Sequence, residues 1–146
     1  MQVAVIGAGA IATWVIDGLR RDGLAPAAAL VRRGRPGGVA AVGSVDALPA
    51  GVTHLVDCAG HSGLAAHGVA ALSAGIDVVT LSPGALADAA LAAELASAAE
   101  AGNARLHLAS GAIGGLDALR AAAAGGLTAV RYTGTKPPPG WAGSPA

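Results

Sequence analysis

The chain has 146 residues, enough for one domain of about 100–150 residues and little more. Hydrophobic residues make up 53% and charged residues 12%, and the formal net charge is zero. This balance excludes the strong positive field that binds nucleic acid or an anionic membrane, so we expect neither as a partner. The aromatic residues are two Trp and one Tyr, so the core must be built from Ala, Val, Leu and Ile.

Cysteine content and hydropathy exclude further classes. The single cysteine, Cys58, rules out an internal disulfide, and the spacing of His, Cys and Asp predicts no metal site. The apolar start lacks the basic opening segment of a secretion signal. Gly, Asp, Pro or Ser interrupts every other apolar run before the roughly 18 residues that a membrane span needs. We therefore expect a cytoplasmic protein.

The chain begins with the pattern of a strand, a turn and a helix. Residues 3–6 are a continuous apolar run, typical of a strand buried on both faces. A pair of glycines breaks the run, and apolar residues at helical spacing follow from residue 11 to about residue 21. Residues 27–31 are a second apolar strand, and a basic, glycine-rich loop follows at 32–38.

The same alternation of strand and helix continues to residue 135, and residues 136–146 show no packing pattern. Its first segment, residues 39–50, is weakly patterned, and its structure stays open. The expected elements are a strand at 53–59, a helix capped by Ser62 that runs to about residue 74, a strand at 76–81, a helix capped by Asp88 that runs through residue 101, a strand at 105–109, a helix at 116–124 and a half-exposed strand at 127–135. Strands separated by helices pair in parallel, so we predict an α/β fold with a doubly wound sheet of Rossmann type.

A G-x-G-x-x-A motif begins at Gly7, where the first strand turns into the first helix. In such a motif the first glycine permits a tight turn, the second (Gly9) lets a pyrophosphate approach the backbone, and the small third residue (Ala12) lets the helix pack on the sheet. The new helix offers free N–H groups and a positive dipole end to the phosphate. A turn that serves packing alone does not explain the second glycine. The motif therefore predicts dinucleotide binding.

The second strand lacks the acidic residue that usually binds the adenosine ribose. That residue is expected roughly 20 positions after the motif, near Val31 and Arg32, where no Asp or Glu occurs. Arg32, Arg33 and Arg35 occur there instead, and arginine beside the ribose favours a 2′-phosphate. The pattern favours NADP as cofactor, or acceptance of both NADP and NAD. The alternative is that these arginines form a solvated loop.

Small residues dominate the loops that follow three of the predicted strands. These loops are residues 58–62, 82–85 and 110–115. Ligands of open parallel sheets bind beyond the carboxyl ends of strands, and small residues there suit a flat nicotinamide ring. Nucleophilic catalysis is disfavoured, because Cys58 is expected to pack as a small hydrophobe and neither Ser82 nor Ser110 has a base at identifiable spacing.

The titratable residues of the strands and helices allow several interpretations. His61 lies just past a predicted strand end, where it either faces a ligand or lies on the surface near a helix start. His54, His67 and His107 fall within predicted strands or helices, and we expect structural roles for them. Asp57 falls inside an apolar strand, where it either faces a polar rim or is buried with a partner.

Several segments together resemble aspartate dehydrogenase, in order and in spacing. They are GAGAIA at 7–12, VDCAGHSGLAAHG at 56–68, GIDVVTLSPGALAD at 75–88, LHLASGAIGGLDALRAA at 106–122 and TGTKPPPGW at 133–141. The SGAIGGLDA block is the most specific of them. It argues against other two-domain dehydrogenases, such as homoserine dehydrogenase or dihydrodipicolinate reductase. The resemblance covers essentially the whole chain.

The resemblance implies an NAD(P)-dependent oxidoreductase acting on a small dicarboxylic amino acid. The family oxidises L-aspartate to iminoaspartate, or aminates oxaloacetate in reverse, and in some members this feeds NAD biosynthesis. The residues that the resemblance places at the pyrophosphate are Gly7, Gly9, Ala10 and Ile11, and those at the nicotinamide end are Ala59, Gly60, Ser82, Ala112 and Ile113.

The resemblance also implies how the chain is organised. Residues 1–125 correspond to the dinucleotide-binding domain, and residues 126–146 to the start of an incomplete α+β substrate domain. The histidine to which the family assigns acid–base catalysis is expected beyond this chain, because none of the four histidines here matches it. The chain is then either the cofactor-binding portion of an oxidoreductase or a stand-alone NAD(P)-binding module without turnover. The open edge of the predicted strand at 127–135 predicts a homo-oligomer, or disorder after about residue 125.

Overall fold

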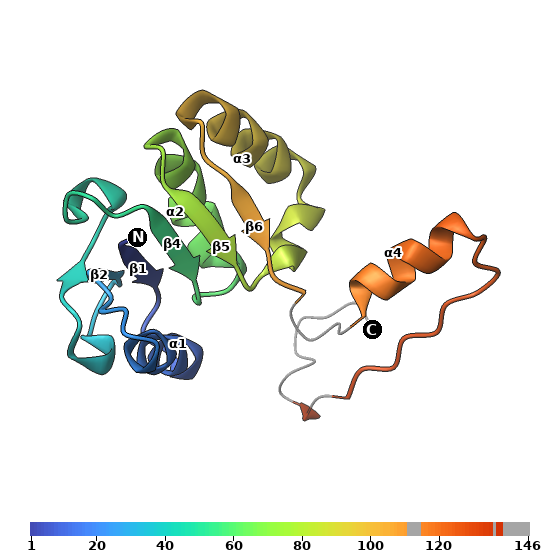
Figure 1. Cartoon of the computed structure of the whole chain (residues 1–146), viewed down its shortest axis with the longest axis horizontal. Coiled ribbons are helices and arrows are strands. Elements are labelled where there is room, and N and C mark those ends of the chain that lie inside the picture. Colours follow the sequence, from blue (N-terminus) through green and yellow to red (C-terminus); the bar gives the residue numbers. More distant parts are fainter. Residues whose placement is uncertain (111–114, 136, 139–146) are drawn as a thin grey trace. The chain divides into compact units, whose positions relative to one another are not determined.

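The computed structural model of the chain describes residues 1–110, 115–135 and 137–138. The chain divides into two compact units, Met1–Gly114 and Gly115–Ala146, which we describe separately (Figure 1). The boundary predicted between residues 125 and 126 stays a prediction. None of the described helices is long and apolar enough to cross a membrane.

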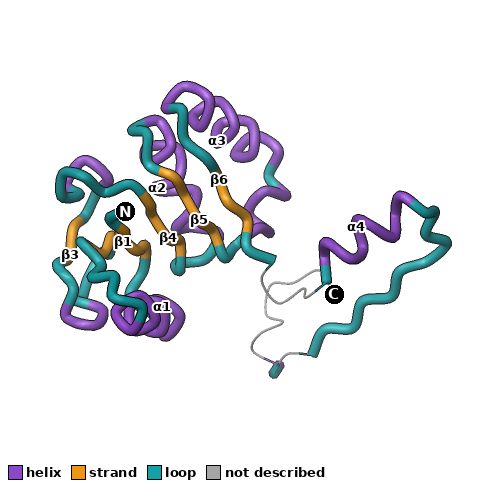
Figure 2. Tube along the Cα trace, in the orientation of Figure 1, coloured by secondary structure: helices purple, strands orange, loops and turns teal. Residues whose placement is uncertain are grey.

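The first unit is built on a parallel sheet of six strands (Figure 2). The strands are β1 (Val3–Ile6), β2 (Ala28–Leu30), β3 (Ala41–Val42), β4 (His54–Asp57), β5 (Asp77–Thr80) and β6 (Leu106–Leu108). Their order across the sheet is β3-β2-β1-β4-β5-β6, and every neighbouring pair is parallel. This is the order of a dinucleotide-binding Rossmann fold, and it confirms the predicted fold class.

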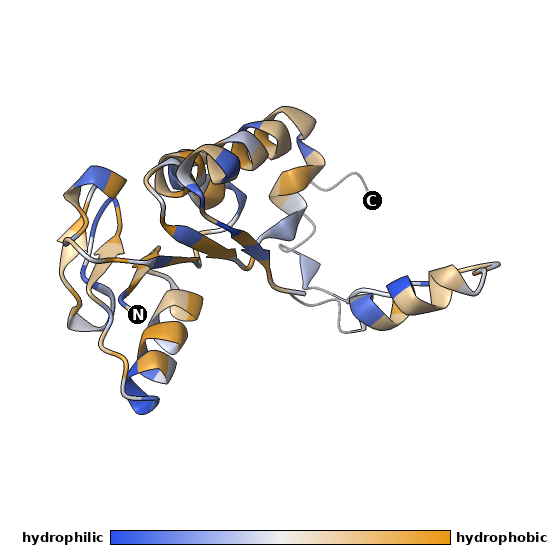
Figure 3. Ribbon diagram, turned by 45° about the horizontal axis from the view of Figure 1, so that its top comes forward, coloured by the Kyte–Doolittle hydropathy of each residue, from blue (hydrophilic) through white to orange (hydrophobic). Residues whose placement is uncertain are grey.

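Helices cover both faces of the sheet. They are α1 (Ala10–Arg21), α2 (His61–Ser73) and α3 (Ala89–Gly102). The short 3-10 turns η1 (Pro36–Gly38) and η2 (Val45–Ala47) lie between strands, and η3 (Pro83–Ala87) lies between β5 and α3. Ile16 of α1 packs with Val5 and Ala29 on one face, whereas Leu64 of α2 packs with Leu55 in a larger core on the other face. Figure 3 shows that the strands between these cores are largely hydrophobic.

Glycine brings the two helices of the larger core close together. A Cβ atom on Gly68 of α2 would lie 2.8 Å from Cδ2 of Leu95 on α3. A Cβ atom on Gly102 would collide with the carbonyl oxygen of Leu72. A core without aromatic residues reaches close packing in this way, because the backbones themselves approach one another.

The helix starts confirm one predicted cap and correct another. Asp88 caps α3 as predicted, since its Oδ1 accepts from the N–H groups of Ala90 and Leu91 at 3.0 and 3.3 Å. The prediction that Ser62 caps α2 was wrong. The N-cap is Gly60, with a φ of 78°, and no side chain caps this helix. The positive φ starts the helix two residues earlier than a cap at Ser62 would, so Ser62 lies inside the first turn.

The second unit contains α4 (Leu116–Ala124), as predicted, but the strand predicted at 127–135 is absent from the described residues. Alternation of side chains indicates two faces, but a strand forms only with a hydrogen-bonded neighbour. No other part of this unit that the structure describes is extended and paired with these residues. Leu127, Val130 and Tyr132 are 43%, 58% and 65% exposed.

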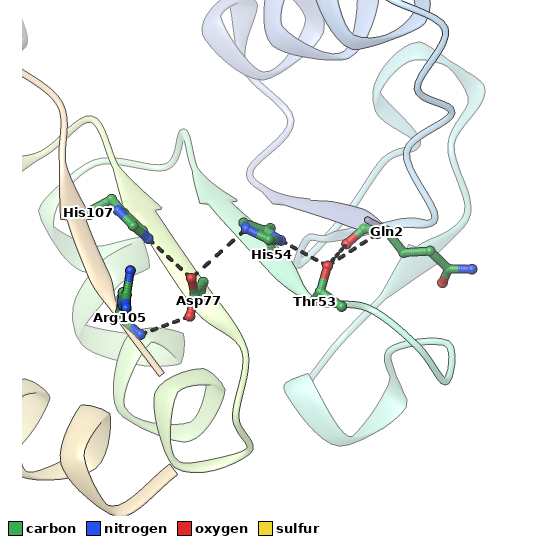
Figure 4. A network of polar contacts seen from close by, with 6 residues as sticks. All are labelled: Gln2, Thr53, His54, Asp77, Arg105 and His107. Atoms are coloured by element: carbon green, nitrogen blue, oxygen red, sulfur yellow. Dashed lines mark hydrogen bonds and ion pairs between the residues drawn. The ribbon is translucent and has the colours of Figure 1, made fainter. Parts of the chain in front are cut away.

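A polar cluster joins the amino ends of three strands in the first unit (Figure 4). Asp77 begins β5, and its Oδ1 accepts from the Arg105 N–H at 2.9 Å. Its Oδ2 lies 3.2 Å from Nε2 of His107 and 4.0 Å from Nε2 of His54. The hydrogen bond with His107, and next the bond from the Arg105 N–H, lower the pKa of the Asp77 carboxyl. Asp77 thus connects β5 to β6 through the hydrogen bond with His107, and it lies beside His54 of β4.

We expect Asp77→Asn to lower the urea midpoint of unfolding at neutral pH, because the negative charge facing both histidines is lost. A carboxyl whose pKa is lowered by folding stabilises the protein fully above its unfolded pKa, and this contribution disappears as the pH falls through the folded pKa. The difference between wild type and variant should therefore shrink below the ordinary pKa of 3.8. Urea unfolding at neutral and acid pH measures it, with exposed Asp46→Asn as control. An equal difference at both pH values would contradict this role.

Candidate cofactor-binding site

A cleft of about 1080 Å³ opens at the carboxyl ends of the central strands. Ile6 pairs with Leu30 on one side and with Asp57 on the other, so β1, β2 and β4 end at the same edge of the sheet. The cleft is lined by residues 6–9, 30–33 and 58–59 and, on α2, by Ser62, Gly63, Ala66 and His67. Its volume suits an organic cofactor, since ligand pockets span about 300–1,000 Å³.

The two glycines of the phosphate motif have different reasons to be glycine. Gly7 has a φ of 109°, and a Cβ there would lie 3.2 Å from both Cβ of Ala59 and the carbonyl oxygen of Cys58. The chain itself therefore requires glycine at position 7. Gly9 is exposed, and apart from its own helix and its chain neighbours no atom of the described residues would lie within 4 Å of a Cβ there. Packing does not require this glycine, which leaves open space for a ligand beside the backbone.

The start of α1 offers donors to an anion. Gly9 is its N-cap, no side chain caps the helix, and its first turn holds no acidic residue. The first N–H groups of the helix, at Ala10 and Ile11, therefore remain for a phosphate group. The Ile11 side chain is 56% exposed and does not line the cleft, so only its backbone serves such a site. Ala12 is fully buried between helix and sheet, as the motif requires.

Basic side chains line the cleft beyond β2. Arg32 and Arg33 are exposed in its wall, whereas Arg35 does not line it. His67 also lines the cleft and is half-buried, although we expected only a structural role for it. The helical spacing could have indicated this position, because His67 lies one turn after Gly63 and therefore shares the same face of α2.

Cys58 follows β4 in the cleft wall and is half-buried. Burial, and next the negative charge of Asp57, raise the pKa of its thiol to about 11. The thiol is therefore protonated at neutral pH, and only the thiolate is a strong nucleophile. This agrees with the expected packing role.

Asp57 and Thr80 form a buried pair beneath this wall. Both side chains are fully buried, and the two residues are register partners on β4 and β5. Thr80 Oγ1 donates to Asp57 Oδ2 at 2.9 Å and accepts from the Ser82 N–H at 3.0 Å. Asp57 Oδ1 accepts from the Ala59 N–H at 3.0 Å. Of the two possibilities for Asp57, the structure shows burial with a partner.

Comparison with known proteins identifies the family. Residues 7–109 match the family model described as homoserine dehydrogenase, NAD binding domain. The chain belongs to this family of NAD-binding domains. A homoserine dehydrogenase from S. aureus shares the fold, with a TM-score of 0.50 and 18% identity.

Curated relatives confirm the resemblance to aspartate dehydrogenase. The L-aspartate dehydrogenase of Ruegeria pomeroyi is 53% identical over 152 residues, which cover 100% of this chain and 55% of that protein. The one from Pseudomonas aeruginosa is 40% identical, over 99% of this chain and 58% of its own length. The crystal structure of aspartate dehydrogenase from Thermotoga maritima aligns with a TM-score of 0.67 and 28% identity, over 83% of this chain and 50% of that one. The chain thus spans about half the length of the relatives it matches.

The NAD-binding domain brings some of the predicted site residues together and leaves others apart. The predicted residues in the cleft wall are Gly7, Gly9, Arg32, Arg33 and Ala59. Gly60 caps α2 and Ser82 caps η3, and neither lines the cleft. Ala112 and Ile113 lie outside the described residues.

His61 lies at a different cleft. This second cleft has a volume of about 360 Å³ and also includes Gly84 and Asp88. A Cβ on Gly84 would lie 2.8 Å from Nε2 of His61, so the imidazole packs against η3. Contact of His61 with the cofactor or substrate stays a prediction.

The two glycines of the motif should respond differently to substitution. We expect Gly7→Ala to lower the free energy of unfolding by about 1–3 kcal/mol, because its backbone conformation strains any L side chain. Gly9→Ala should change it by less than about 0.5 kcal/mol, because the new methyl group meets no protein atom. Urea unfolding of both variants measures the difference. A similar loss at both positions would show that Gly9 also serves packing.

Proposed function

We propose that this chain is the coenzyme-binding portion of an NAD(P)-dependent oxidoreductase that acts on L-aspartate. The observation that carries the proposal is the open space beside Gly9, at the uncapped start of α1 and inside the large cleft. A dinucleotide pyrophosphate fits a site of backbone donors with no side chain in the way. The substrate is proposed from the relatives, which are L-aspartate dehydrogenases. A cytoplasmic location and a homo-oligomeric state remain part of this proposal.

The basic end of the cleft supports NADP as the preferred coenzyme. Arg32 and Arg33 lie in the wall directly after β2, the strand whose end normally contacts the adenosine ribose. No carboxylate stands there to repel a 2′-phosphate. Guanidinium groups bind phosphate by charge-assisted, often bidentate, hydrogen bonds. His67 lines the same cleft, and its imidazole ring is a third side chain there that can donate a hydrogen bond.

Turnover with L-aspartate distinguishes this proposal from a stand-alone binding module. The module is favoured by the position of the described cleft-lining residues, which all lie within residues 6–67. The assay follows nicotinamide absorbance with L-aspartate and oxidised coenzyme, and in reverse with oxaloacetate, ammonium and reduced coenzyme. We expect coenzyme binding in either case. Turnover that is specific for aspartate would assign the activity to this chain. Binding without turnover would support the coenzyme site and assign no substrate to this chain alone.

Loss of Arg32 and Arg33 should weaken the binding of NADP selectively. We expect Arg32→Gln and Arg33→Gln together to weaken NADP binding by about ten-fold or more, because hydrogen bonds to charged groups contribute about 1.5–3 kcal/mol each. NAD binding should change by less than about two-fold, since NAD lacks the 2′-phosphate. Isothermal titration calorimetry with each coenzyme measures this, and Arg35→Gln is the matched control outside the cleft wall.

Two results of this titration would count against the proposal. Unchanged NADP affinity in the double variant would show that the arginines are a solvated loop. No heat with either coenzyme at millimolar concentration, in the wild-type chain, would overturn the coenzyme site itself.

A further inference from the structure

The buried pair Asp57 and Thr80 is not used by the coenzyme site as described so far. They are the buried polar side chains of the described residues, and they end two neighbouring strands at the edge where the cleft opens. A carboxyl group loses strongly favourable hydration on burial, so its retention needs compensating contacts. A neutral side chain would connect the two strand ends without that cost.

The hydrogen bonds indicate that Asp57 is ionised. Thr80 Oγ1 accepts from the Ser82 N–H, so its single proton is directed to Asp57 Oδ2. The other oxygen, Oδ1, accepts from the Ala59 N–H. Both oxygens therefore act as acceptors, which is the pattern of a carboxylate rather than a carboxylic acid. Gly63 of α2 encloses the group, because a Cβ there would lie 2.8 Å from Asp57 Oδ1.

The strand order places this charge on one particular half of the cleft. The pyrophosphate donors lie between β1 and α1, and the arginines that suit the adenosine phosphate follow β2 on one side of β1. A dinucleotide that crosses the sheet at this point places its other nucleotide on the opposite side, over β4 and β5. Asp57 ends β4, directly before Cys58 and Ala59 of the cleft wall. Its field reaches that wall, since it contributes to the raised pKa of Cys58.

We propose that the Asp57 carboxylate is a specificity-determining charge that favours the oxidised coenzyme, whose nicotinamide ring is positively charged, over the neutral reduced ring. The inference rests on the proposed function, because it requires a nicotinamide coenzyme in this cleft. A buried charge acts through a medium of low dielectric and is little screened by salt, so it acts on the ring without direct contact. Thr80 serves as a positioning residue, because its hydroxyl holds the carboxylate and the Ser82 backbone together.

The test measures the dissociation constants of oxidised and reduced coenzyme for wild type and Asp57→Asn, with the NADP pair and the NAD pair. Asparagine keeps the shape and one acceptor but removes the charge. We expect the ratio of the oxidised to the reduced dissociation constant to rise by about five-fold or more. Asp57→Ser is the second neutral variant, should asparagine prevent folding, because its hydroxyl can still accept from the Ala59 N–H.

Variants of Thr80 distinguish an effect of the Asp57 charge from an effect of the position of the loop at Ser82. Thr80→Val removes the hydroxyl and keeps the charge, so it should weaken both forms of the coenzyme alike and leave the ratio within about two-fold, whereas Thr80→Ser should change neither. A ratio unchanged in the neutral Asp57 variants would overturn the inference alone. If Thr80→Val changes the ratio as much as the neutral Asp57 variants do, the effect comes from the position of the loop, and the inference is also overturned. A wild-type chain that binds neither coenzyme would overturn the proposed function together with this inference.

Discussion

The parallel register of the sheet is the constraint on which the site depends. Ile6 aligns with Leu30 on one side and with Asp57 on the other, and Asp57 aligns in turn with Thr80. Four strands therefore stop at one level, and the chain turns away from the sheet at the same edge each time. No single loop forms the cleft. If one strand shifted by one residue, each of its side chains would point to the opposite face of the sheet. Asp57 or Leu30 would then face the wrong helix layer.

Small residues make this arrangement possible at short distances. Gly63 lets the first turn of α2 close over Asp57, and Gly7 lets the phosphate turn lie against Ala59. The phosphate turn, the loop after β4 and the start of α2 thus meet at Ala59. A chain with almost no aromatic residues buries little apolar area with each side chain, but its helices and strands can approach one another more closely. The ligand site uses that same proximity, because donors of the main chain come within reach of the cleft.

Much of this could be predicted from local patterns, and what could not depends on tertiary contacts. The order of strands and helices and the phosphate motif at Gly7 and Gly9 follow from periodicity and from backbone requirements that are local. The cap of α2 was missed because Gly60 and Ser62 both suit a helix start, and only the φ of Gly60 decides between them. The strand predicted at 127–135 fails because alternation does not specify a neighbour.

The partner of Asp57 lies 23 residues away on the next strand, so no local pattern could name it. Once the register is known, the placement of charge along β4 and β5 has a physical logic. At the amino ends, Asp77 is accessible and meets two histidines and a backbone N–H, contacts that tie adjacent strands together. At the carboxyl ends, Asp57 is buried and meets only a neutral hydroxyl and a backbone N–H. The first carboxylate has its hydrogen-bond partners, the His107 ring and the Arg105 N–H, on the neighbouring strand β6 or directly before it. The second has no cation of the described chain among its hydrogen-bond partners, and its uncompensated field extends into the cleft, where a positively charged ring would complete the pair.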